Sequence, residues 1–344
     1  MDLACDESGS EGERLVGGVT DVFAHASVRL TSDAATECVQ ELRRRIRSPA
    51  TEYKANHLLR EKNRSTLVWL LGATGPILGR ARVHLTDKEF FVVRKVADLL
   101  VDDGGYAASL GLCQGTEARA VAETLYREGR SGLPRARWQG FLTAFNYLLR
   151  PRNRQGVWLS VDDFQRVVDD LHGEPTGPLG AVLARLRPAR PRIEALLTTL
   201  LDNPEAVPAL NPIIPAIVSA VSHWGADGRP VSIVHDRQSA LTGVHVRQLQ
   251  EVLGGPDPTL VGPVPRGRLA ALTFVESHLD PRVQVADFLA GTARKIAENA
   301  LHGHGDPELV TLLRAYVDPY SIWADERSWS GLAPAPRTVD GAYR

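Results

Sequence analysis

Acidic residues that could bind metal ions stand at three separated places in the sequence. Asp6 and Glu7 follow the first apolar segment, Asp236 ends a later one, and Asp287 lies among apolar residues in an amphipathic pattern. Carboxylates that converge from several elements supply the hard oxygen ligands and negative charge that Mg²⁺ or Mn²⁺ requires. Two such ions, about 3.5–4 Å apart, activate a water and stabilise the leaving oxygen in phosphodiester cleavage. The set therefore indicates a metal-dependent hydrolytic site.

Each of these acids also has a purely structural interpretation. The segment Asp6-Glu7-Ser8-Gly9 has the composition of an ordinary turn. Asp236 could simply end its strand, and Asp287 could be a buried carboxylate paired with Arg294 or His278. The metal-site hypothesis rests on the set as a whole rather than on any one member.

Strands that could position these acids are expected at both ends of the chain. Valine-rich and alternating segments predict a β meander early in the sequence and further strands later on. These strand segments cover residues 3–5, 15–23, 26–30, 80–85, 231–234 and 269–275.

Helices are expected between and after these strands, over residues 31–47, 60–71, 90–101 and, longest, 281–301. In the last helix, Gln284, Asp287 and Gly291 are three and four residues apart, so they share one stripe of the helix surface.

The middle of the chain has a different character from its two ends. Between residues 102 and 228 the periodic segments are helical and are separated by glycine and proline. We therefore expect an α/β core formed by residues 1–101 and 229–301 and split by an all-helical insertion over 102–228. Residues 302–344 would form a C-terminal extension.

Composition excludes several classes of protein. The 344 residues carry 41 acids and 40 bases, so a nucleic-acid partner would need segregated charge, with acids at the site and bases at its rim. Prolines break the most apolar run, 207–222, and the N-terminus lacks the pattern of a signal peptide. Cys5, Cys38 and Cys113 form no zinc or disulfide pattern. We therefore expect a cytoplasmic protein with no membrane partner.

Arginines and aromatic residues alternate between residues 129 and 158, where no acid occurs. Arginine for phosphates and rings for unstacked bases would suit a nucleic-acid surface. However, the spacing of Trp138, Phe141 and Phe145 is that of a buried helical face, so we expect these rings to form core. The arginines remain as a substrate-binding edge, namely Arg135, Arg137, Arg150, Arg152 and Arg154.

Four ordered segments resemble a known bacterial family. They read LACDESG (residues 3–9), EYK (52–54), VHD (234–236) and VQVADFLAG (283–291). Together they resemble the signatures of the family called domain of unknown function 3800 (DUF3800), of the ribonuclease H-like nuclease superfamily. The resemblance covers residues 1–101 and 229–301 and implies a ribonuclease H-like mixed sheet flanked by helices.

The resemblance also implies roles for individual residues. Asp6, Glu52, Asp236 and Asp287 would be catalytic metal ligands, with Glu7 as a further ligand. Gln284 and Ser8 would support the site. Lys54, one of only five lysines, would contact phosphate or a carboxylate.

The sequence thus favours a Mg²⁺- or Mn²⁺-dependent phosphodiesterase, a nuclease hydrolysing DNA or RNA by a two-metal mechanism. One alternative is a non-catalytic module that binds a protein partner through the helical insertion. Another is an enzyme that acts on a small nucleotide-like substrate in the same metal site.

Overall fold

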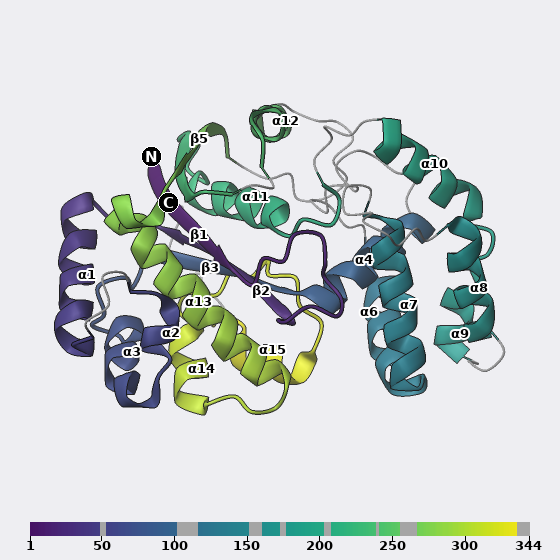
Figure 1. Cartoon of the computed structure of the whole chain (residues 1–344), viewed down its shortest axis with the longest axis horizontal. Helices are drawn as coiled ribbons and strands as arrows, with labels where there is room; N and C mark the ends of the chain where they lie inside the picture. Colours follow the sequence, from purple (N-terminus) through teal and green to yellow (C-terminus); the bar gives the residue numbers. More distant parts are fainter. Residues whose placement is uncertain are drawn as a thin grey trace, which may run out of the picture.

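The computed structural model describes residues 1–48, 53–101, 116–150, 160–172, 177–202, 208–238, 241–254 and 267–335. Its centre is a five-stranded sheet in the order β3-β2-β1-β4-β5 (Figure 1). The strands are β1 (Asp2–Ser8), β2 (Val22–Val28), β3 (Ala81–Asp87), β4 (Val231–Asp236) and β5 (Leu269–Val275). The expected mixed sheet flanked by helices is confirmed.

The central strand β1 has antiparallel neighbours on one side and parallel neighbours on the other. It pairs antiparallel with β2, which pairs antiparallel with β3, whereas β1·β4 and β4·β5 are parallel. Successive side chains of a strand point to opposite faces. The register therefore places Ala4, Asp6 and Val234 on one face, and Leu3 and Cys5 on the other.

Helices cover both faces of the sheet. One face packs against α1 (Ser32–Ile46), α3 (Arg64–Leu71), α13 (Pro281–Leu301) and α14 (Pro307–Leu313). The other face packs against α11 (Ile213–Trp224) and α12 (Gly243–Gly254). The helix expected over residues 281–301 has those bounds in the structure.

Helix α1 shows how the sequence specifies these elements. Thr31 caps its N-terminus, with the Thr31 hydroxyl accepting a hydrogen bond from the Ala34 N–H. Its apolar residues recur at helical spacing and form its buried face, as the sequence predicted: Ala35, Cys38, Val39, Leu42 and Ile46.

A second hydrophobic core lies among the helices of the middle segment, which Figure 1 shows at one end of the molecule, opposite α1 and α3. It contains residues of α4 (Lys88–Val101), α6 (Thr116–Gly132), α7 (Arg135–Leu148), α8 (Val161–His172), α9 (Gly177–Ala184) and α10 (Arg190–Asp202). Trp138, Phe141 and Phe145 are buried in it, which confirms that these rings form core.

The expected β meander at residues 15–23 and 26–30 is wrong, because the structure has a single strand, β2, in this region. Residues 9–21 instead form a loop between β1 and β2. Leu15 and Val16 look strand-like in sequence, but they pack into the core of the helical segment. Gly17 adopts a φ of +67°, a left-handed conformation that turns the chain.

The C-terminal segment runs along the outer edge of β3. Val83 N–H donates to Tyr316 O, Asp318 N–H to Val83 O, and Ile322 N–H to Leu85 O, each at 2.8 Å. Helix α15 (Glu326–Leu332) follows. In the described part of the chain, none of the helices combines the length and apolar character needed to cross a membrane.

Candidate functional site

Asp6, Asp236 and Asp287 lie on the face of the sheet that α13 covers. Asp6 lies opposite Ala26, and Ala26 packs in the same core as Ala286 of α13. By strand alternation, Asp236 shares this face with Asp6. Three elements that are far apart in the sequence thus each contribute one acid.

These acids interact strongly with one another. Burial raises the pKa of Asp6 to about 9, with repulsion from Glu7, Asp287 and Asp236 contributing in that order. Burial also raises the pKa of Glu7 to about 7; Asp236 and Asp287 add repulsion, and a hydrogen bond from Gln238 opposes it. The four acids therefore form an electrostatic cluster that carries less than its full negative charge at neutral pH, although strand alternation places Glu7 on the other face of the sheet from Asp6 and Asp236.

Asp236 and Lys54 are connected through the start of the short helix η2 (Ser277–Leu279). The Ser277 N–H donates to Asp236 Oδ1 at 2.8 Å, and Lys54 Nζ donates to Ser277 Oγ at 3.2 Å. Lys54 is therefore linked to Asp236 through Ser277, whereas its contact with phosphate or a carboxylate stays a prediction. Glu52 lies outside the described residues.

A close helix contact places Lys54 there. Gly291 of α13 lies against α2 (Ala55–Leu58), the short helix that Lys54 precedes. A Cβ added to Gly291 would lie 2.2 Å from Ala55 Cβ, so only glycine permits this approach. Gly291 was predicted to share a stripe with Asp287, and its lack of a side chain is what allows α2 to reach the site.

A buried histidine pair lies beside Glu7. The Nε2 atoms of His25 and His235 are 3.2 Å apart, and His235 Nε2 is 3.7 Å from Glu7 Oε2. His235 Nδ1 lies 2.8 Å from Asp236 O, which can only accept, so Nδ1 carries the hydrogen and Nε2 accepts from His25. Burial lowers the pKa of His235 to about 4 and holds the pKa of His25 well below its usual value. Both rings are therefore neutral at pH 7.

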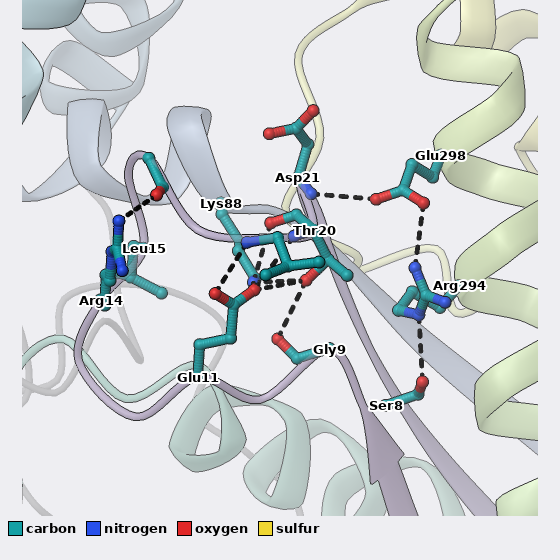
Figure 2. A network of polar contacts seen from close by, with 12 residues as sticks. Ser8, Gly9, Glu11, Arg14, Leu15, Thr20, Asp21, Lys88, Arg294 and Glu298 are labelled. Atoms are coloured by element: carbon teal, nitrogen blue, oxygen red, sulfur yellow. Dashed lines mark hydrogen bonds and ion pairs between the residues drawn. The ribbon is translucent and has the colours of Figure 1, made fainter.

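Ser8 and Gln284 have contacts of their own. Arg294 Nε donates to Ser8 Oγ at 3.0 Å, and Arg294 pairs with Glu298 at 2.9 Å (Figure 2). Glu298 also accepts from the Asp21 N–H, so this chain of contacts joins α13 to the ends of β1 and β2. Gln284 donates to His278 O at 3.3 Å, near the start of α13.

The loop after β1 is held in place by a buried lysine. Lys88 Nζ donates to Glu11 Oε1 at 2.9 Å and to both the carbonyl and the hydroxyl oxygen of Thr20, as Figure 2 shows. Glu11 also accepts from the N–H groups of Val19 and Thr20. Burial opposes ionisation of Glu11, but these hydrogen bonds lower its pKa to about 2.

The same loop is fixed to the helical segment by Asn146 of α7. Asn146 Oδ1 accepts from the Leu15 N–H at 3.2 Å, and Asn146 Nδ2 donates to Glu13 O at 2.9 Å. The strand that carries Asp6 and Glu7 is therefore followed directly by a loop that is bonded to the second core.

The donor set suits a hard divalent cation. Within the described residues, no three His, Cys, Asp or Glu side chains stand already gathered as a metal-binding group. The clustered acids nevertheless offer only oxygen ligands, which Mg²⁺ and Mn²⁺ prefer. In addition, Glu7 Oε2 is buried and accepts no hydrogen bond from any described residue. Asp6, Glu7, Asp236 and Asp287 thus fit such an ion chemically.

The predicted basic edge is only partly described. Arg135 and Arg137 are exposed at the start of α7, whereas Arg150 is nearly buried, with its guanidinium 5.5 Å from the centre of the Tyr147 ring. Arg152 and Arg154 lie outside the described residues.

Sequence reasoning missed three residues that contact the acid cluster, His235, Gln238 and Ser277, and a fourth, His25, that contacts His235. The sequence did contain a feature that could have marked His235 as a neighbour of the acids, since it stands beside Asp236 in an apolar strand. Ser277 and Gln238 had none, because they reach the acids only through tertiary contacts.

Comparisons of the chain with protein-family models, with curated proteins and with solved structures found no match.

Proposed function

We propose that this protein is a divalent-metal-dependent phosphodiesterase, a nuclease that hydrolyses DNA or RNA. The observation that carries the proposal is the electrostatic cluster of Asp6, Glu7, Asp236 and Asp287. Acids that repel one another destabilise a fold unless protons or a cation neutralise them, and one of these four, Asp6, is buried. Binding of Mg²⁺ or Mn²⁺ would neutralise such a group at a pH where protons no longer do.

The arrangement of the sheet supports a ribonuclease H-like core. The order β3-β2-β1-β4-β5, with β1 antiparallel to β2 and parallel to β4, is compatible with the mixed sheet that the resemblance to DUF3800 implies. Asp6 in the first strand, Asp236 at the end of a later strand and Asp287 on the long helix would then be the catalytic acids.

In phosphodiester hydrolysis, individual residues of the chain would have the following roles. Asp6, Asp236 and Asp287 would hold the metal ions, with Glu7 and Glu52 as further ligands. Bound metal supplies an activated water and stabilises the leaving oxygen. Lys54 would orient the scissile phosphate, and Ser277 fixes the Asp236 carboxylate by its N–H donation. Ser8 would support the site through its contact between β1 and α13, and Gln284 through its contact between α13 and η2.

The test is a titration of Mg²⁺ and Mn²⁺ into the full chain with labelled single- and double-stranded DNA and RNA. We expect metal-dependent cleavage that Asp287→Asn reduces by at least ~10²-fold, because the acid acts directly on the ions that perform the reaction. Asp162→Asn is the matched control. Its side chain is exposed on α8 in the helical segment, and its loss should leave cleavage unchanged.

The outcomes separate the proposal from its alternatives. Equal cleavage by Asp287→Asn would show that the site is wrong or that the activity is a contaminant. Binding of nucleic acid without cleavage at any metal concentration would favour a non-catalytic module. Cleavage of a small phosphodiester, but of no polymer, would favour a nucleotide-like substrate.

A further inference from the structure

The C-terminal end of α1 carries a dense group of arginines. Arg43, Arg44, Arg45 and Arg47 are all exposed, and we call these four residues the arginine patch. Glu41 pairs with Arg44 at 2.7 Å and with Arg45 at 2.6 Å, so one acid serves two of the four bases. Residues 41–47 contain four bases and one acid, so this stretch of sequence is positively charged although the whole chain is nearly neutral.

The helix dipole explains part of this group, because cations stabilise the end of a helix. It does not explain Arg47. This residue has a φ of +50°, and within the described ranges it is the only non-glycine residue with a positive φ. Glycine is strongly preferred at such a helix end because its lack of a Cβ removes the steric strain. The chain keeps an arginine where stability favours glycine.

Two of the guanidinium groups are held against aromatic rings. Arg43 lies 5.4 Å from the centre of the Tyr53 ring, and Arg45 lies 4.4 Å from the centre of the Trp69 ring. Such stacking limits the motion of the side chains and leaves guanidinium edges to bind oxygen atoms. The patch is thus partly organised before any partner binds.

A chain of contacts leads from the patch to the candidate site. Arg43 lies over Tyr53, the residue before Lys54, and Lys54 donates to Ser277, whose N–H donates to Asp236. The patch and the acid cluster are therefore linked by one continuous set of residues on the α13 side of the sheet.

The arginines of the helical segment are arranged differently. Arg119, Arg127, Arg187 and Arg190 each pair with an acid, at distances between 2.7 and 3.2 Å. Each of these four bases pairs with a different acid, whereas Arg44 and Arg45 of the patch share Glu41.

We propose that the arginine patch binds the phosphate backbone of the nucleic-acid substrate, on the side of the scissile phosphate where Lys54 lies. This inference rests on the proposed nuclease function and specifies which surface of the protein the polymer follows. Phosphates are the chemically matching partner because guanidinium groups bind phosphate oxygens through paired hydrogen bonds.

The test measures binding of labelled DNA and RNA oligonucleotides to the full chain in EDTA, over a series of salt concentrations, together with melting temperature. Arg47→Gly should move the two measurements in opposite directions. The melting temperature should rise by about 2 °C because left-handed strain is removed. Affinity should fall, and the salt slope of log K should become shallower by ~0.9, the value expected for one lost contact with double-stranded DNA.

Two further variants make the result specific. Arg47→Lys keeps the charge and should restore most of the affinity and the salt slope. Arg166→Ala removes an exposed arginine from α8, outside the patch, and should change neither.

Unchanged affinity and slope in Arg47→Gly would overturn the inference, as would an equal change in Arg166→Ala. Absence of binding by the unmodified protein would also overturn it. Because binding is measured without metal, a protein that binds through the patch but does not cleave would contradict only the proposed nuclease function. Cleavage by the protein, together with binding that is unchanged in Arg47→Gly, would contradict only the inference about the arginine patch.

Discussion

At the scale of single residues, the acid cluster makes metal-free protein sensitive to pH. Asp6 has its pKa raised to about 9 and Glu7 to about 7, both from ordinary values near 4. Because these folded-state pKa values lie above the unfolded ones, the folded protein binds more protons than the unfolded chain between about pH 4 and 9. The contribution of both groups to stability is therefore fully present below pH 4 and is lost as pH rises through this window.

We predict that the free energy of unfolding in EDTA falls as pH rises from 5 to 9, and that Asp6→Asn shows a weaker fall. Mg²⁺ or Mn²⁺ should stabilise the unmodified protein more at pH 8 than at pH 5, because protons compete with the ion for the carboxylates. Urea titrations at several pH values, with and without metal, measure both effects. Equal metal stabilisation at both pH values would contradict the assignment of these acids as ligands.

The three aspartates could be found from the sequence because each follows or interrupts an apolar segment, which marks a carboxylate held at the end of a buried element. Two other neighbours of Glu7, Gln238 and His25, could not be found in this way. Gln238 lies in a loop and His25 lies in a different strand, so only the register of the sheet brings them to the acids. The local sequence gives the type of each side chain, whereas strand pairing and other tertiary contacts decide which side chains lie next to it.

At the scale of elements, the contact between α13 and α2 fixes the position of Lys54. Gly291→Ala should lower the free energy of unfolding by ~1–3 kcal/mol, since the new Cβ would overlap Ala55 and force α2 away. Gly140→Ala is the matched control: a Cβ at Gly140 of α7 meets no atom within 4 Å. Because alanine favours helix over glycine, that change should stabilise by up to ~1 kcal/mol.

Chemical denaturation of both variants gives the comparison. A Gly291→Ala protein as stable as Gly140→Ala would show that α2 does not approach α13 as closely as the structure describes. If Lys54 orients the substrate, Gly291→Ala should also weaken metal-dependent cleavage.

Strongly periodic elements were predictable, and weakly periodic ones were not. The 21 residues of α13 show a sustained helical repeat between Asp280, which caps the N-terminus, and the following loop, so both ends could be located. Leu15 and Val16 gave a false strand signal because apolar residues in a loop are indistinguishable from strand residues when the loop packs into another core. Apolar residues in a local sequence pattern indicate that a segment is buried, but not which part of the protein it packs against.

At the scale of the whole molecule, the C-terminal segment stabilises the sheet from its edge. Tyr316 is fully buried against the α13 side of the core, and its hydroxyl donates to Leu71 O at 3.2 Å. Tyr316→Ala should therefore cost ~3–5 kcal/mol, as expected for removing a large buried ring. Tyr320→Ala removes the same side chain from a position that is 72% exposed and should change stability by less than ~0.5 kcal/mol.

Thermal and urea unfolding of the two tyrosine variants distinguish these cases. Similar stability of both would mean that residues 316–322 do not belong to the cooperative core. The sequence alone could not predict this role, because the C-terminal extension has no strand pattern of its own and reaches β3 through single backbone bridges.

The pairing of β1 with β4 has a consequence for how the protein is made. Asp2 lies opposite Ser232, and residues 316–322 form backbone hydrogen bonds with the edge of β3, so the sheet joins segments that are far apart in the sequence. During synthesis the ribosome must therefore release the chain as far as β4, which ends at Asp236, before the central strand gains its second neighbour. Such long-range contacts slow folding and expose unpaired strands in the meantime. Asp6 is synthesised long before Asp287, and the acid cluster cannot form until Asp287 has left the ribosome, so shorter nascent chains lack the assembled acid cluster.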